Sequence, residues 1–169
     1  RLRRRLMPRR GPGGSRLLSD GPVRSRAGAV VMTEAVDRAM RFSLNVLGGP
    51  ADQASARSAL QFARAILDGG HEIHRVFFQG AGVHLASALT VVPQDEDDPA
   101  EAWAALGREH DLDLVVCVAS ALRRGLLDDA EAARYDRGRG NLRPEFTISG
   151  LGQLVDAALR SDRVVTFAP

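Results

Sequence analysis

The segment 112–118 (LDLVVCV) decides the fold. Apart from one aspartate it is apolar throughout, which is typical of a parallel strand covered by helices on both faces. Three further segments of strand type are 41–47 (RFSLNVL), 72–78 (EIHRVFF) and 163–167 (RVVTF). Helical segments separate the four, and strands that alternate with helices imply right-handed crossovers. The sequence therefore predicts a three-layer α/β/α domain with a mostly parallel sheet of four to five strands.

The helical segments are recognised by apolar residues that recur at three- and four-residue spacing. Residues 55–67 carry such a stripe, and we expect Ser55 to cap this helix at its N-terminus. Residues 100–109 form a second helix that places Trp103 and Leu106 on one side. The other predicted helical segments are 82–89, 119–126, 128–135 and 151–160.

The charges are divided unevenly along the 169 residues. Residues 1–40 hold ten arginines and three acidic residues (+7), and residues 41–169 hold thirteen arginines and eighteen acidic residues (−5), which together give +2. The pI of 9.4 therefore describes the N-terminal arm and does not indicate a nucleic-acid-binding domain. No apolar run approaches the roughly 20 residues of a membrane helix, so we expect a soluble, cytoplasmic protein.

Residues 1–39 are expected to form a disordered, Arg-rich extension before a domain at 40–169. The first thirty residues are rich in Arg, Gly, Pro and Ser and bury too little apolar surface to offset the entropy of ordering. Three interpretations are open: a basic tail that contacts nucleic acid, a targeting peptide, or a start site assigned too far upstream. We favour the last, because an orderly strand begins directly after Met40.

The single cysteine, Cys117, stands near the end of the predicted strand at 112–118 and before a predicted helix. One cysteine excludes an internal disulfide and a CxxC pair. Chemistry in open parallel sheets gathers at the carboxyl ends of the strands, and the start of a helix stabilises a thiolate or a persulfide anion. Arg123 and Arg124 would add positive potential if either turns back toward an accessible sulfur. The alternative, a small buried hydrophobe, is the commoner role of a free cysteine.

Other polar groups give weaker signals. The histidines lack metal-ligand spacing, and His71 and His74 face opposite sides of a strand. Residues 95–98 (DEDD) are interpreted as a solvated acidic loop, a partner-binding rim or the start of a helix. The segment 48–50 (GGP) matches no phosphate-loop motif, and 149–152 (SGLG) fits either an anion cradle or a closely packed helix cap.

Segments across the whole domain, from Met40 to about Phe167, resemble the TusD/DsrE family of intracellular sulfur-relay proteins. The family's persulfide-carrying cysteine stands directly before a VA-A-LRRG stretch and therefore falls on Cys117. The resemblance also implies the flavodoxin-like DsrE fold. The segments that carry it are 117–125 (CVASALRRG), 146–155 (FTISGLGQLV), 162–167 (DRVVTF), 70–78 (GHEIHRVFF), 93–96 (PQDE) and 58–63 (SALQFA).

The resemblance implies a sulfurtransferase that works in a heterohexamer with two related small subunits, TusB/TusC-like or DsrF/DsrH-like. Cys117 would accept persulfide sulfur from a TusA-like donor and pass it to a TusE/DsrC-like acceptor, without metal, cofactor, membrane or direct tRNA contact. We expect the pathway to be 2-thiolation of the tRNA wobble uridine, with sulfur oxidation of the DsrE type as the alternative. A non-catalytic assembly subunit and a flavodoxin-like nucleotide-binding module remain further alternatives.

The sequence departs from the family pattern at three places. Ala51 or Asp52 stands where a Tyr is usual, and Gln79 stands where an aromatic residue tends to follow the FF pair. The stretch from His84 to Ser87 (HLAS) replaces an Asn-containing one. We expect these loops to border the sulfur site, so that the changes affect the choice of partner more than the fold.

Overall fold

Five parallel strands form the sheet of this α/β domain. The computed structural model describes residues 38–51 and 53–169; the expectations for residues 1–37 and for Asp52 lie outside the described residues. The strand order is β4-β3-β2-β1-β5, and each neighbouring pair is parallel. The strands are β1 (Arg41–Val46), β2 (Glu72–Phe78), β3 (Leu114–Cys117), β4 (Phe146–Ser149) and β5 (Arg163–Phe167).

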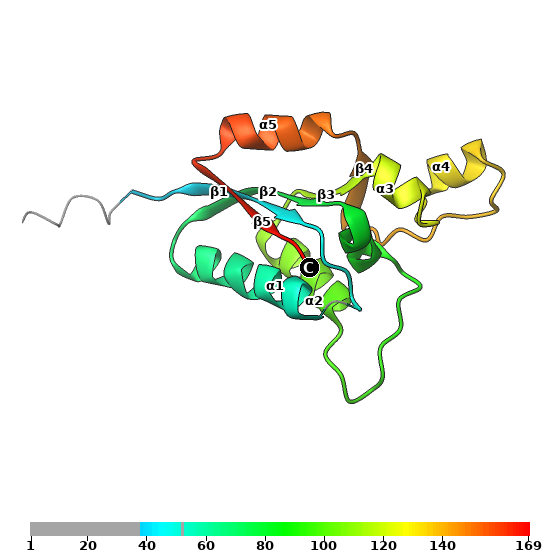
Figure 1. Cartoon of the computed structure of the whole chain (residues 1–169), viewed down its shortest axis with the longest axis horizontal. Coiled ribbons are helices and arrows are strands. Elements are labelled where there is room, and N and C mark those ends of the chain that lie inside the picture. The colour runs from blue at the N-terminus through cyan, green and yellow to red at the C-terminus, as the bar shows by residue number, and fades with distance from the viewer. Residues whose placement is uncertain (1–37, 52) are drawn as a thin grey trace, which may run out of the picture. The chain divides into compact units, whose positions relative to one another are not determined.

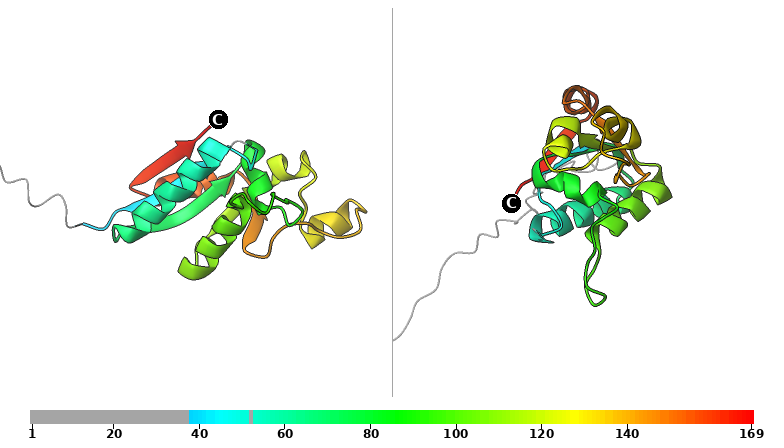
Figure 2. Two further views of the ribbon diagram at one scale, coloured as in Figure 1. Left: turned by 90° about the horizontal axis from the view of Figure 1, so that it is seen from below. Right: turned by 90° about the vertical axis from the view of Figure 1, so that its right-hand side faces the viewer.

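The helices cover the sheet unequally. Figures 1 and 2 show α1 and α2 on one face, α5 on the other, and α3 and α4 beyond the end of β3. Along the chain the strands are added in one direction from β1 to β4, and the connection after β4 then returns across the sheet to β5. Right-handed connections that run in opposite directions place their helices on opposite faces of a sheet, so α5 lies on the face opposite α1 and α2. The helices are α1 (Gln53–Asp68), the 3₁₀ helix η1 (Gly80–Ala86), α2 (Pro99–His110), α3 (Val118–Leu122), α4 (Asp129–Arg134) and α5 (Gly152–Arg160).

Two apolar clusters follow from this unequal cover. The larger lies between the sheet and α1 and α2, where Phe78 packs edge-on against Trp103 with ring centroids 5.3 Å apart. Trp103 and Leu106 are both buried, which confirms the predicted apolar side of α2. The smaller cluster, on the face covered by α5, consists of Phe77, Val115 and Cys117, with Leu154 packed against it.

Two predictions of secondary structure are wrong. The short strand β4 was missed, because four residues at the edge of a sheet carry too little periodicity to be recognised. Ser55 is not the N-cap of α1, since that helix already begins at Gln53. Ser55 is buried within the helix, and its hydroxyl has no hydrogen-bond partner among the described residues.

Glycines allow η1 to pack directly on the end of β1. A Cβ atom added to Gly82 would lie 2.3 Å from the carbonyl oxygen of Val46, and one added to Gly49 would lie 2.7 Å from that of Ala81. Gly49 and Gly82 therefore serve close backbone packing. None of the helices in the described part of the chain is long and apolar enough to cross a membrane.

Candidate functional site

A row of polar side chains crosses the carboxyl edge of the sheet on the face covered by α5. Side chains alternate between the faces of a strand, so Asn45 of β1 lies on the same face as its register partner Thr166 of β5. Asn45 donates to Thr166 at 3.3 Å and accepts from the side-chain amide of Gln79 at 2.8 Å. Cys117 and its register partner Ser149 continue the row on β3 and β4. Gln79, one of the departures from the family pattern, thus belongs to the cysteine's edge of the sheet.

The thiol of Cys117 is buried in this row. The residue is 7% exposed and packs in the smaller cluster with Phe77, Val115 and Leu154. In the single chain the sulfur is therefore largely covered, since α5 lies on this face of the sheet, and sequence periodicity does not show which strand lies beneath that helix. Chemistry at this sulfur requires a local displacement of its cover.

The segment after the cysteine is only partly as expected. Cys117 is the N-cap of α3, but its side chain makes no capping hydrogen bond and the helix is five residues long. The macrodipole of so short a helix is small, since it sums over few peptide units. Arg124 turns back and donates to the carbonyl oxygen of Ser120 at 3.3 Å, whereas Arg123 caps the C-terminal end of α3. Ser120 in turn accepts a hydrogen bond from Gly80 and joins α3 to η1.

Arg75 anchors α5, the helix whose Leu154 packs against the cluster of the cysteine. Its side chain, 12% exposed, donates to Asp113 at 2.6 Å, to the carbonyl oxygen of Gln153 at 2.9 Å and to Asp156 at 3.1 Å. Two of these acceptors belong to α5 and one precedes β3, so a single guanidinium joins the cover to the sheet. A hydrogen bond from Arg160 holds the pKa of Asp156 below its ordinary value against the opposing effect of desolvation, and Arg75 adds to the lowering.

The histidines do not form a metal site in the described residues, where no group of three or more His, Cys, Asp or Glu side chains lies together. His71 accepts from the backbone of Met40 at 3.3 Å, and His74 lies 3.7 Å from Asp156 of α5. His71 stands just before β2, so only His74 belongs to that strand, and the two histidines have different partners.

The acidic loop divides into two parts. Asp98 is the N-cap of α2 and accepts from the backbone of Ala100 and Glu101, which confirms the interpretation as a helix start at this position. The other residues of 95–98 are exposed. At Glu101, a hydrogen bond from Arg108 lowers the pKa below its ordinary value, and a second from Arg143 adds to the effect.

The segment 149–152 does not pack closely. Cβ atoms built on Gly150 and Gly152 meet no atom within 4 Å, so the interpretation as a closely packed cap is wrong. Leu151 is the N-cap of α5 and makes no side-chain capping bond. The anion-cradle interpretation stays a prediction.

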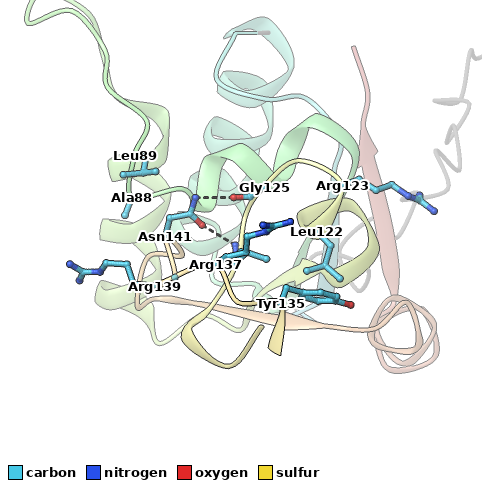
Figure 3. Close-up of a pocket in the computed structure, with 11 residues that line it drawn as sticks. Ala88, Leu89, Leu122, Arg123, Gly125, Tyr135, Arg137, Arg139 and Asn141 are labelled. Atoms are coloured by element: carbon cyan, nitrogen blue, oxygen red, sulfur yellow. Dashed lines mark hydrogen bonds between the residues drawn. The ribbon is translucent and has the colours of Figure 1, made fainter. Parts of the chain in front are cut away.

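A pocket of about 800 Å³ opens beside α3 (Figure 3). Its walls come from the segment after η1, the end of α3, and the loop that follows α4, and they include Arg123, Arg137 and Arg139. Sequence reasoning missed this pocket because its walls are far apart in the chain. It lies next to the departure at 84–87, since Ala88 and Leu89 line it and Ser87 accepts a hydrogen bond from the backbone of Leu89.

The fold and the cysteine define a DsrE-like α/β domain. Residues 40–167 match the model of the DsrE/DsrF-like family, and the chain belongs to this family. It is 48% identical over 128 residues to the DsrE protein of Allochromatium vinosum, covering 76% of this chain and 98% of that relative. It is also 48% identical over 128 residues to Sulfurtransferase TusD of Salmonella dublin, covering 76% of this chain and all of that relative.

A solved structure supports the fold alone. The crystal structure of the ychN protein from E. coli matches with a TM-score of 0.61 at 17% sequence identity. The match covers 76% of this chain and 99% of that protein.

Proposed function

We propose that this chain is a sulfurtransferase subunit that carries sulfur as a persulfide on Cys117 and relays it to an acceptor thiol. The observation that carries the proposal is the place of the only cysteine, at the end of strand β3, in a chain 48% identical to Sulfurtransferase TusD over that relative's full length. The Cys117 thiolate attacks the outer sulfur of a donor persulfide, and the donor leaves as a thiolate. An acceptor thiolate then attacks the outer sulfur now held on Cys117. No external oxidant or reductant is needed.

The packing around Cys117 is compatible with such a carrier, because a single helix lies on this face of the sheet. One nine-residue helix covers this face of the sheet, and Leu154 supplies its apolar contact with the cluster of the cysteine. Loading therefore follows a local opening of α5 or the docking of a protein that displaces it. A sulfur that is buried between transfers is also protected from oxidation by solutes, because oxidation follows exposure of the thiolate.

Assembly with related subunits is part of the proposal. The outward side of α5 exposes Leu151, Val155 and Leu159 at four-residue spacing, and Val164 on the edge strand β5 is also exposed. Apolar stripes of this kind mark protein–protein contacts more often than free surface. We assign them to contacts with two related small subunits in a heterohexamer in the cytoplasm, served by a TusA-like donor and a TusE/DsrC-like acceptor.

The first test is sulfur loading of the purified full chain. After incubation with a protein persulfide donor, the peptide that contains Cys117 should gain the mass of one sulfur atom, and reduction should remove it. Cys117→Ser should gain none and keep its unfolding midpoint. A thiol that stays unloaded in the assembled complex would contradict the proposal.

The destination that we propose for the sulfur is the 2-thiolation of the tRNA wobble uridine. Equal identity to a DsrE protein makes transfer into sulfur oxidation the second candidate. In cells that lack the gene, the full chain should restore 2-thiouridine measured by mass spectrometry of digested tRNA, and Cys117→Ser should not. Restoration of sulfur oxidation alone would support the second candidate. Restoration by Cys117→Ser would instead support a non-catalytic assembly subunit.

A further inference from the structure

Three arginines without an acidic partner border the pocket beside α3; in the view of Figure 3 the side chain of Arg137 lies across the pocket, and those of Arg123 and Arg139 extend outward from its rim. Arg123, Arg137 and Arg139 line it, and none of the three forms an ion pair with a described residue. The rest of the domain behaves differently, because most of its other arginines are neutralised by carboxylates. The arginines with a carboxylate partner are Arg41, Arg57, Arg75, Arg108, Arg134, Arg143 and Arg160.

The pocket also has an apolar wall. Leu89 and Tyr135, two of the large apolar side chains that remain exposed in the described residues, both line it, together with Leu122 and Leu127. In the view of Figure 3 the Arg137 side chain crosses the middle of the pocket between Gly125 and Leu122. Unpaired cations beside apolar surface match an organic anion rather than a bare inorganic one.

The wall of the pocket is held in place before any ligand arrives. The side chain of Asn141 donates to the carbonyl oxygen of Gly125 at 2.9 Å and accepts from the backbone of Leu127 at 2.9 Å (Figure 3). Its own backbone oxygen accepts from Ala88 at 2.8 Å, which ties the third segment to the other two. A preformed wall reduces the entropy that a ligand loses on binding.

The length of α3 between its two cap residues fits a short peptide. Cys117 and Arg123 are the N-cap and C-cap of α3, and six residues of helix span about 9 Å. An extended tripeptide spans about 10 Å. A volume of about 800 Å³ also lies within the usual range for small-molecule sites.

Resting on the proposed function, we infer that this pocket binds the carboxylates of a peptide-sized, low-molecular-weight persulfide that donates sulfur to Cys117. The arginines hold the acid groups, and the ligand extends along α3 so that its persulfide meets Cys117 when the local cover of the sulfur opens. The Cys117 thiolate then attacks the outer sulfur and the bond between the ligand's two sulfurs breaks. The ligand leaves as a thiolate, and the proton on the outer sulfur stays on the new persulfide. The domain thus has a small-molecule entry for sulfur in addition to its protein donor.

Binding is tested with S-methylglutathione, which carries two carboxylates and cannot react. Calorimetry on the full chain should detect binding that weakens about tenfold for each of Arg137→Gln and Arg139→Gln, the usual effect of one charge-assisted hydrogen bond. Arg64→Gln, an exposed arginine on α1 outside the pocket, should bind as the parent does. No binding, or binding that an equal concentration of sulfate abolishes, would overturn the inference. Binding of an acidic peptide by a chain that does not bind S-methylglutathione would also overturn the inference.

The rate at which Cys117 is loaded by different sulfur donors distinguishes the inference about the pocket from the proposed function. Glutathione persulfide should load Cys117 with saturating kinetics, and the double variant of Arg137 and Arg139 should be slower by about tenfold or more. Inorganic polysulfide, which has no carboxylate, should load parent and variant within twofold of each other. If glutathione persulfide loads the parent and the double variant at equal rates, the inference about the pocket is overturned and the proposed function is not. Failure of every donor to load Cys117 overturns the proposed function, and the binding measurement still decides the pocket.

Discussion

Replacing Arg75 with methionine should open the cover of Cys117. The substitution keeps the apolar stem of the side chain and removes its three hydrogen bonds to Asp113, Gln153 and Asp156. Because the parent guanidinium joins α5 to the sheet, its loss weakens that attachment while the larger core between the sheet and α1 and α2 stays intact.

The magnitude follows from burial. A hydrogen bond to a charged group contributes about 1.5–3 kcal/mol to stability. The carboxylates of Asp113 and Asp156 are over a third exposed, so solvent screening reduces the contribution of each bond. We expect Arg75→Met to lower the free energy of opening by about 2–3 kcal/mol in total. At about 1.4 kcal/mol per tenfold, the open population should rise roughly 30- to 140-fold.

The single thiol makes this opening measurable. The rate of reaction of Cys117 with an aromatic disulfide reagent, under native conditions and at limiting reagent, reports the open population of this one site. Arg160→Gln is the matched control, because it also removes a partner of Asp156 but from an exposed position, and it should change the rate less than about threefold. A variant Arg75→Met that loses unfolding free energy in urea while its thiol reacts at the parent rate would refute the reasoning.

Three further outcomes are expected. Gly82→Ala should lower the free energy of unfolding by about 2–3 kcal/mol in urea denaturation, because the added carbon would lie 2.3 Å from a carbonyl oxygen of β1; a loss below about 0.5 kcal/mol would contradict the close packing. In the folded domain Glu101 and Asp156 have pKa values below their ordinary values of 4.5 and 3.8. Their ionised forms therefore stabilise the folded state at pH values above the ordinary pKa, and this stabilisation is lost as the pH falls through the lowered pKa of the folded state. Urea midpoints should therefore fall below about pH 4.5, and a flat profile down to pH 3 would argue against both ion pairs. Ser55→Ala removes a buried hydroxyl without a described partner and should leave stability unchanged or raise it by about 0.5–1 kcal/mol; a loss above 1 kcal/mol would reveal a partner.

Local patterns predicted most elements well. The strand at 41–47 is observed as β1, and the helix at 100–109 is observed as α2 with its apolar side buried. The strand at 112–118 is trimmed to Leu114–Cys117, so the cysteine is its last residue. These succeed because hydrophobic periodicity depends on neighbours only a few residues apart. Strand β4 was missed because its four residues are recognisable only beside β3.

The sequence by itself determined the alternation of strands and helices, the parallel sheet and the place of Cys117 at a strand end, since each follows from short-range periodicity and chain direction. Only the tertiary structure decided that the return crossover packs Leu154 of α5 against the cluster of the cysteine and that Arg75 joins this helix to the sheet. The same is true of the arginine pocket, whose walls come from segments up to about fifty residues apart. Contacts between distant segments depend on how the strands are ordered in the sheet, and no local pattern encodes that order.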